Sequence, residues 1–326
     1  MTEQPLLEVE NLRIDLAVAG KRFAAVQDVS FTIRRGETLG LVGESGCGKS
    51  ITALSLIGLL RDPLMIGGGT IRFAGREIQN LSAAEMRKLR GNRISMIFQE
   101  PMTALNPLSP VGRQIAEMFV LHKGVGWKEA ESLAVEALAS VRVPAPERRV
   151  KDYPHQLSGG MRQRVMIAIA LACGPDLLLA DEPTTALDVT VQAEILDLIR
   201  ELSAAKGTAV LMISHDLGLI ANMCRRVGVM YAGKLVEERP AEDVFRSPSH
   251  PYTSGLVASL PLLGARARHG RQRLKEITGV VPPVSAFPAG CRFNPRCYAA
   301  TELCRMDDPG VTPLGGDGFV RCHHHE

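Results

Sequence analysis

The chain has 326 residues, of which 45% are hydrophobic and 22% charged, and its formal net charge is +3. This composition is typical of globular proteins, and the small charge does not by itself indicate nucleic-acid binding. No apolar run reaches the roughly 18 residues that a membrane-spanning helix needs. The first residues lack the pattern of a secretory signal, so we expect a cytoplasmic chain with reduced cysteines.

Hydrophobic periodicity predicts strands that alternate with helices along most of the chain. The predicted strands span residues 6–14, 24–33, 38–42, 70–73, 94–98, 177–180 and 208–213. The predicted helices span residues 49–60, 130–141, 161–172 and 191–202, and three glycines at 67–69 predict a turn. This alternation indicates an α/β fold with a parallel sheet, whose ligand binds beyond the carboxyl ends of the strands.

A phosphate-binding loop of the form GxxxxGK[ST] occupies residues 43–50, between a predicted strand and a predicted helix. Its glycines let backbone N–H groups approach a phosphate, and the following helix directs its positive end at the anion. We expect Lys49 to reach the β- and γ-phosphates of ATP, and the Ser50 hydroxyl to bind Mg²⁺. Cys47 is interpreted as a small side chain in the loop, not as a catalytic thiol.

Polar residues follow three other predicted strands, where a sheet of this kind binds its ligand. Asp181 and Glu182 end an apolar strand. Beside a phosphate loop, Asp181 can hold Mg²⁺ through its water shell, and Glu182 can act as the general base for the attacking water. We expect His215 to contact the γ-phosphate and the Gln99 amide to contact Mg²⁺ or the attacking water.

Together these motifs resemble the nucleotide-binding subunit of an ATP-binding-cassette (ABC) transporter over about residues 6–240. The resemblance implies an ABC-type P-loop ATPase core with a helical subdomain at about residues 100–172. It identifies Leu157-Ser-Gly-Gly160 with the signature motif, Gln99 with the Q-loop, Asp188 with the D-loop and His215 with the switch histidine. The residues that it implies around the nucleotide are Gly43, Glu44, Ser45, Gly46, Cys47, Gly48, Lys49, Ser50, Ile51, Leu157, Ser158, Gly159, Gly160, Asp188 and, for adenine stacking, Phe23.

Three segments resemble the dipeptide/oligopeptide importers within that family: residues 99–107, residues 153–164, and His250-Pro-Tyr252 followed by a Cys-rich end. The resemblance implies an ATPase that powers import of short peptides at the cytoplasmic face of the inner membrane. Its partners would be a second ATPase subunit, identical or paralogous, two permease subunits and, indirectly, a substrate-binding protein. The two cassettes of the family pair head to tail, so Ser158 and Gly160 would bind the γ-phosphate held by the partner's lysine.

Two other functions are weighed against peptide import. The first keeps the mechanism and changes the cargo to nickel, opines or sugars. The second is a soluble cassette ATPase that acts on ribosomes or DNA. The single phosphate loop, about one hundred residues ahead of Leu157, argues against the second class, so we expect no nucleic-acid partner.

The composition changes near residue 247, which predicts a nucleotide-binding domain at residues 1–249 and a small C-terminal domain at 250–326. The latter contains Cys291, Cys297, Cys304 and Cys322. Four cysteines in a segment with little else to form a core suggest a metal site, and their spacing differs from the CxxC pairs typical of structural zinc. Thiolate sets of four also hold [4Fe–4S] clusters. The importer resemblance favours this cluster, with zinc or free thiols as alternatives.

Overall fold

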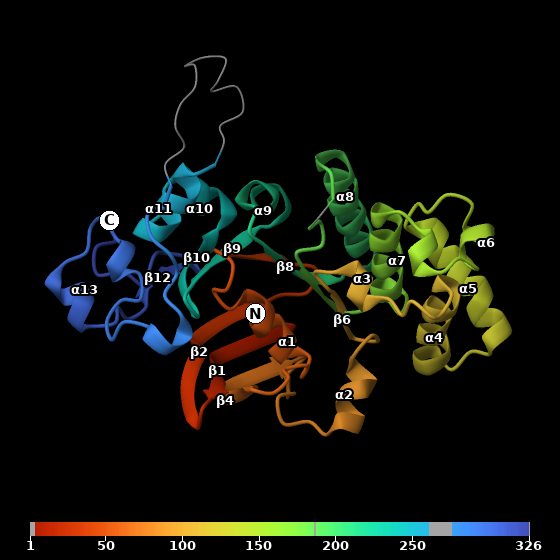
Figure 1. The fold of residues 1–326 in the computed structure, drawn as a ribbon, viewed down its shortest axis with the longest axis horizontal. Coiled ribbons are helices and arrows are strands. Elements are labelled where there is room, and N and C mark those ends of the chain that lie inside the picture. The colour runs from red at the N-terminus through yellow and green to blue at the C-terminus, as the bar shows by residue number, and fades with distance from the viewer. Residues whose placement is uncertain (1–3, 186, 261–275, 326) are drawn as a thin grey trace, which may run out of the picture. The chain divides into compact units, whose positions relative to one another are not determined.

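The computed structural model describes residues 4–185, 187–260 and 276–325 (Figure 1). The chain divides into two compact units, which are described separately. The first, named the helical unit here, contains Met1–Leu6, Ile33–Glu37 and Phe73–Ile213. The second, named the phosphate-loop unit, contains Leu7–Thr32, Thr38–Arg72 and Ser214–Glu326.

Three parallel strands form the sheet of the helical unit. Strand β7 (Leu177–Asp181) lies between β6 (Ile94–Ile97) and β8 (Ala209–Ser214), with parallel pairing on both sides. Every residue of β7 and β8 is buried. Near-continuous apolar runs of this kind are typical of parallel strands covered on both faces. The predicted strands at 94–98, 177–180 and 208–213 are therefore confirmed.

Helices make up most of the rest of this unit. Helix α5 (Trp127–Ser140), α7 (Gly159–Leu171) and α8 (Val189–Lys206) confirm three predicted helices with small shifts at their ends. Helix α4 (Val111–Lys123) was not predicted, although its buried Ile115, Ala116 and Phe119 follow helical spacing. Helices α4 and α5 pack against each other and against α7. The shorter elements are β5 (Arg76–Glu77), α2 (Ala83–Leu89), α3 (Pro101–Ala104), α6 (Pro146–Arg149) and η1 (Pro154–Gln156).

The phosphate-loop unit has a sheet that continues to the C-terminal part of the chain. Strand β3 (Thr38–Val42) pairs in parallel with β9 (Arg226–Tyr231), and β10 (Lys234–Pro240) pairs antiparallel with β9. Strand β12 (Phe319–Val320) then pairs antiparallel with β10, and β11 (Thr312–Pro313) with β12. Residues far beyond 250 thus extend the sheet that begins at the phosphate loop.

A second sheet of this unit places β1 (Leu7–Val18) between β2 (Lys21–Ile33) and β4 (Leu64–Phe73). The turn predicted at residues 67–69 is wrong, because these glycines lie inside β4. Gly69 has a φ of +84°, and a Cβ atom there would lie 2.5 Å from the carbonyl oxygen of Asn11. Glycine is therefore needed for backbone approach within a strand, and not for a turn.

Helix α1 (Lys49–Leu56) follows the phosphate loop and ends earlier than the predicted residue 60. Gly58 has a φ of +60°, and the Leu59 N–H donates to the carbonyl of Leu54 at 2.9 Å. This left-handed glycine with a bond back to the last turn is a standard helix end, which the glycine in the sequence could have signalled.

The C-terminal residues do not form a separate compact unit, so the small Cys-rich domain of the predicted fold is not supported. The boundaries 1–249 and 250–326 stay a prediction, and part of the latter, 261–275, is outside the described residues. The short elements are α9 (Leu217–Met223), α10 (Ala241–Arg246), α11 (Pro251–Ala258), η2 (Val284–Ala286), η3 (Asn294–Arg296) and α13 (Glu302–Met306).

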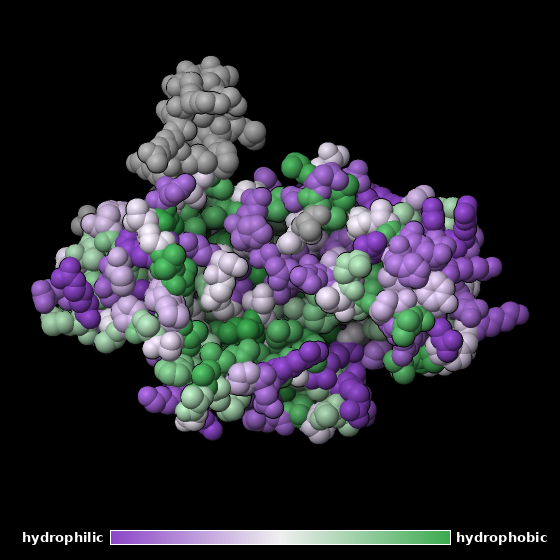
Figure 2. Space-filling model, viewed as in Figure 1, coloured by the Kyte–Doolittle hydropathy of each residue, from purple (hydrophilic) through white to green (hydrophobic). Residues whose placement is uncertain are grey.

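Surface hydropathy varies over the molecule. Figure 2 shows hydrophobic residues gathered on the visible face over β1, β2 and α1, which precede and follow the phosphate loop in the chain. Among the described residues, no helix combines the length and the apolar character needed to cross a membrane.

Candidate active site

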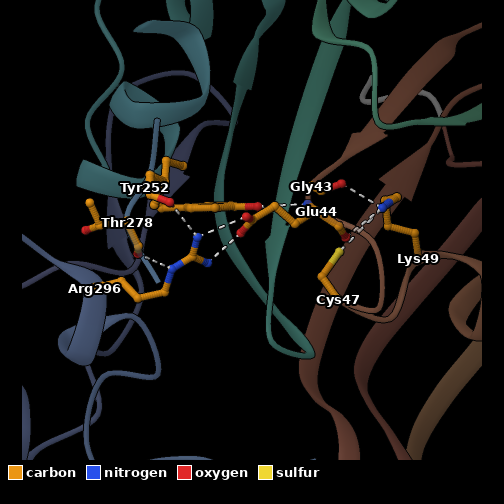
Figure 3. A network of polar contacts seen from close by, with 8 residues as sticks. Gly43, Glu44, Cys47, Lys49, Tyr252, Thr278 and Arg296 are labelled. Carbon is orange, nitrogen blue, oxygen red and sulfur yellow. Dashed lines mark hydrogen bonds and ion pairs between the residues drawn. The ribbon is translucent and has the colours of Figure 1, made fainter. Parts of the chain in front are cut away.

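The phosphate-binding loop joins β3 to α1. Strand β3 is buried except for partial exposure of its first residue, so the loop leaves a firmly packed strand. Gly48 caps α1 with a left-handed φ of 109°. The buried Lys49 Nζ donates hydrogen bonds to the carbonyl oxygens of Gly43 (2.7 Å) and Glu44 (3.0 Å), as Figure 3 shows. An ammonium group is thereby fixed beside the N-terminal end of a helix, the arrangement that binds a phosphate.

Cys47 lies inside this loop with its Sγ 3.6 Å from Lys49 Nζ. Burial raises the pKa of the Cys47 thiol, although the charge of Lys49 lowers it in part. The thiol is therefore protonated at neutral pH and unsuited to act as a nucleophile. This supports its interpretation as a small buried side chain.

The predicted catalytic base lies at the carboxyl end of β7. Gln99 Nε2 donates to Glu182 Oε2 at 3.1 Å, and the hydroxyl of Thr185 donates to the same oxygen at 2.9 Å. The Glu182 backbone has a φ of +45°, while its N–H donates to the carbonyl of Ile213 at 2.9 Å. A non-glycine residue in this strained conformation is a frequent feature of functional sites. Two of the predicted site residues are thus in direct contact.

Asp181 is the last residue of β7, and it is 4% exposed. Magnesium prefers oxygen ligands, usually one or two carboxylates together with phosphates and water. The carboxylate of Asp181 and the amide oxygen of Gln99, both in the helical unit, are groups of this kind. Their chemistry is that of magnesium ligands, and the complete site with Ser50 stays a prediction.

The predicted signature motif, residues 157–160, lies at the start of α7. The Ser158 side chain accepts the Met161 N–H at 3.3 Å, so Ser158 caps the helix and its two following glycines lie in the first turn. The buried amide of Gln163 donates to the carbonyl of Pro183, which links α7 to the segment after Glu182. Asp188 similarly caps α8 by accepting the Val191 N–H at 3.0 Å.

Two predicted residues lie in the phosphate-loop unit outside the loop. His215 is exposed between β8 and α9, and the following Asp216 caps α9 by accepting the N–H groups of Gly218 and Leu219. Phe23 is half-buried on β2, the strand whose Val26 lies against Gly48. The contacts of His215 and Phe23 with a nucleotide stay predictions.

Sequence reasoning missed two residues that contact the phosphate loop. Tyr252 Oη accepts a hydrogen bond from the Glu44 N–H at 2.8 Å. Arg296 Nη1 and Nη2 donate to the two carboxylate oxygens of Glu44 at 2.6 and 3.0 Å (Figure 3). Tyr252 was noted only as part of a family resemblance, and nothing in the local sequence indicates the partner of Arg296.

The metal site predicted at Cys291, Cys297, Cys304 and Cys322 is not supported. Among the described residues, no group of three or more His, Cys, Asp or Glu side chains is arranged to hold a metal ion. Burial raises the pKa of the Cys291 thiol to about 11, and the other three cysteines raise it further. None of the four cysteines takes part in a disulfide among the described residues. Their sequence spacing alone did not establish a coordination geometry.

Two sequence profiles match the chain. The ABC transporter profile matches residues 26–185, and the profile described as "Oligopeptide/dipeptide transporter, C-terminal region" matches residues 236–304. A relative from Sinorhizobium fredii, named "Probable peptide ABC transporter ATP-binding protein", is 52% identical over 97% of this chain and 94% of its own length. The oligopeptide transport ATP-binding protein of Salmonella typhimurium is 51% identical over 93% of this chain and 89% of its own length.

Solved structures resemble the fold. A dimeric post-hydrolysis state of the ATP-binding cassette MJ0796, bound to ADP and Pi, is 27% identical with a TM-score of 0.65, covering 72% of this chain and 98% of that one. The structure of cbiO1 from Clostridium perfringens, part of an ABC transporter complex, is 26% identical with a TM-score of 0.63, covering 75% of this chain and 92% of that one.

Proposed function

We propose that this chain, which belongs to the ABC transporter family, is the ATP-hydrolysing subunit that powers import of short peptides through a membrane transporter. The contact of Gln99 with Glu182 at the end of a buried strand supports the ATPase, because it orients a carboxylate where a general base is needed. The match of residues 236–304 supports the peptide cargo.

The residues divide the chemistry between binding and hydrolysis. The N–H groups of the loop and the ammonium of Lys49 bind the phosphates of ATP. Ser50, Asp181 and Gln99 would hold Mg²⁺, which would neutralise phosphate charge. Glu182 orients the attacking water and accepts its proton, and Gln99 and Thr185 fix the Glu182 carboxylate in one orientation. His215 contacts the γ-phosphate.

The signature motif acts on a second subunit, identical or paralogous. Ser158 and Gly160, at the start of α7, bind the γ-phosphate held by the partner, as a helix N-terminus does. In the assembled transporter, Ser158→Arg should lower ATP turnover by about tenfold or more, because an oxyanion-type contact is lost. The ATP affinity of the isolated chain should not change. An affinity loss in the isolated chain would contradict the division between two sites, and Ser140→Arg on α5 is the control.

The chain binds at the cytoplasmic face of the inner membrane through two permease subunits, and a binding protein delivers the peptide to them. The test is peptide uptake into proteoliposomes that contain the assembled complex, with ATP enclosed on the side of this subunit. We expect labelled di- to pentapeptides to accumulate only with hydrolysable ATP. ATP-driven uptake of nickel or a sugar, with no uptake of peptides, would show that the cargo is not a peptide.

An iron–sulfur cluster stays a prediction from the four cysteines and the family resemblance, and the proposed function does not depend on it. Anaerobically purified chain that contains iron and acid-labile sulfide in equal amounts would support it. Chain without iron would contradict it, in line with the lack of a metal-holding group among the described residues.

A further inference from the structure

The described residues 276–325, named the C-terminal segment here, contact the phosphate loop directly through one residue of that loop. Glu44 follows the first glycine of the loop, and both its backbone and its side chain are held. Tyr252 accepts the Glu44 N–H, and Arg296 forms a two-point ion pair with the Glu44 carboxylate. All three residues belong to the phosphate-loop unit, and Figure 3 shows them meeting from the loop, from α11 and from the C-terminal segment.

All three guanidinium nitrogens of Arg296 donate hydrogen bonds, so its side chain is held in one orientation. Its Nε donates to the carbonyl of Thr278 at 2.9 Å, and Nη2 also reaches the carbonyl of Ile277 at 3.3 Å. Its side chain is only 4% exposed, whereas that of Glu44 is 31% exposed. A planar guanidinium matches a carboxylate at two points, which fixes orientation as well as charge.

A packed cluster of aromatic rings lies next to this contact. The ring centroids of Tyr231 and Tyr252 are 4.6 Å apart, and Phe293 lies 5.1 Å from Tyr231 and 5.3 Å from Tyr252. Tyr231 ends β9, the strand beside β3, and Arg296 lies over its ring at 5.8 Å. The aromatic rings therefore fix the C-terminal segment to the same sheet from which the phosphate loop emerges.

From these contacts we infer that Arg296 and Tyr252 are positioning residues for ATP: they hold Glu44 so that the phosphate loop keeps its binding conformation. The inference rests on the proposed ATPase and gives the C-terminal segment a role in ATP binding. A loop held from outside does not lose as much conformational freedom when ATP binds, so affinity rises. Coupling between two sites is reciprocal, so ATP must also stabilise the contacts of the C-terminal segment.

The affinity test uses the full chain and a fluorescent ATP analogue. We expect Arg296→Met and Glu44→Gln each to weaken binding about tenfold, within the usual range for coupled sites, and Arg296→Lys to restore part of the loss. The double variant should bind no more weakly than either single one, because the same ion pair is lost only once. Arg305→Met, an exposed arginine of the same segment, is the matched control and should bind as the wild type.

Equal affinities in all variants, or fully additive losses, would overturn the inference. Hydrogen exchange gives a test that needs no variant: ATP should slow amide exchange at residues 276–296 in the wild-type chain, and Glu44→Gln should remove this effect. Unchanged exchange in the wild-type chain with ATP bound would also overturn it. A wild-type chain that binds no ATP would instead contradict the proposed function.

Discussion

The phosphate loop and the Glu182 site are held in different ways. Residues distant in the chain hold the loop: Tyr252 is 208 positions and Arg296 is 252 positions from Glu44. Gln99 and Thr185, in the helical unit, hold the carboxylate of Glu182, whose backbone has a φ of +45°. The phosphate loop and the Glu182 carboxylate thus have separate structural supports. Changes in one should therefore leave the other largely intact.

The largest effect is expected at Lys49, which serves the binding side of this comparison. Lys49→Ala should weaken ATP binding about 30-fold or more and reduce ATPase activity to background, because a charge-assisted contact is worth about 2 kcal/mol or more. Equilibrium titration with labelled ATP measures it, with the exposed Lys88→Ala as the control. Normal affinity in Lys49→Ala would show that Lys49 does not contribute to ATP binding.

A smaller effect is expected at Gln99, on the hydrolysis side. Gln99→Leu removes the donor to Glu182 Oε2 and one of the proposed Mg²⁺ ligands, so kcat should fall roughly tenfold and KM should rise by a smaller factor. Steady-state ATPase kinetics of the assembled complex separate the two values. Gln79→Leu is the control, because Gln79 contacts Glu77. A rise in KM with unchanged kcat would assign Gln99 to binding instead.

The last effect is a pH dependence beside the phosphate loop, which acts on stability and leaves the chemistry at Glu182 unchanged. His250 caps α11 by accepting the Tyr252 N–H, and burial lowers the pKa of His250 to about 3. The unfolded chain, with an ordinary histidine pKa near 6.5, binds more protons between these values. This contribution to stability is therefore complete above pH 6.5 and is lost as the pH falls towards 3, by about 1.4 kcal/mol per unit.

Urea unfolding at pH 7 and pH 5 measures this effect. His250→Asn keeps a helix-capping acceptor and removes the titration. The wild type should lose about 2 kcal/mol more than His250→Asn between the two pH values. Equal losses would show that His250 is not the group responsible. Hydrogen exchange at pH 5 compares the two units directly. Amides of the phosphate-loop unit, which contains His250, should exchange faster than those of the helical unit.

The sequence predicted what depends on local pattern. The loop at 43–50 and the buried β7 are continuous segments, and the rule that ligands bind at the carboxyl ends of parallel strands brought Gln99 and Glu182 together. Arg296 could not be predicted, because its ion pair with Glu44 depends on how the chain returns to the loop. For the four cysteines, the spacing in the sequence predicted a metal site. Whether such residues coordinate a metal depends on side-chain geometry in irregular loops. Among the described residues, that geometry does not support a metal site.

The measurement that tests the account most directly is ATP affinity and ATP turnover of Glu182→Gln in one preparation, with the exposed Glu136→Gln as the control. We expect an affinity within about twofold of wild type and a turnover in the assembled complex that falls about 100-fold or more, the usual contribution of a general base. Unchanged turnover, or an affinity that falls in parallel with turnover, would contradict the separation of binding from hydrolysis.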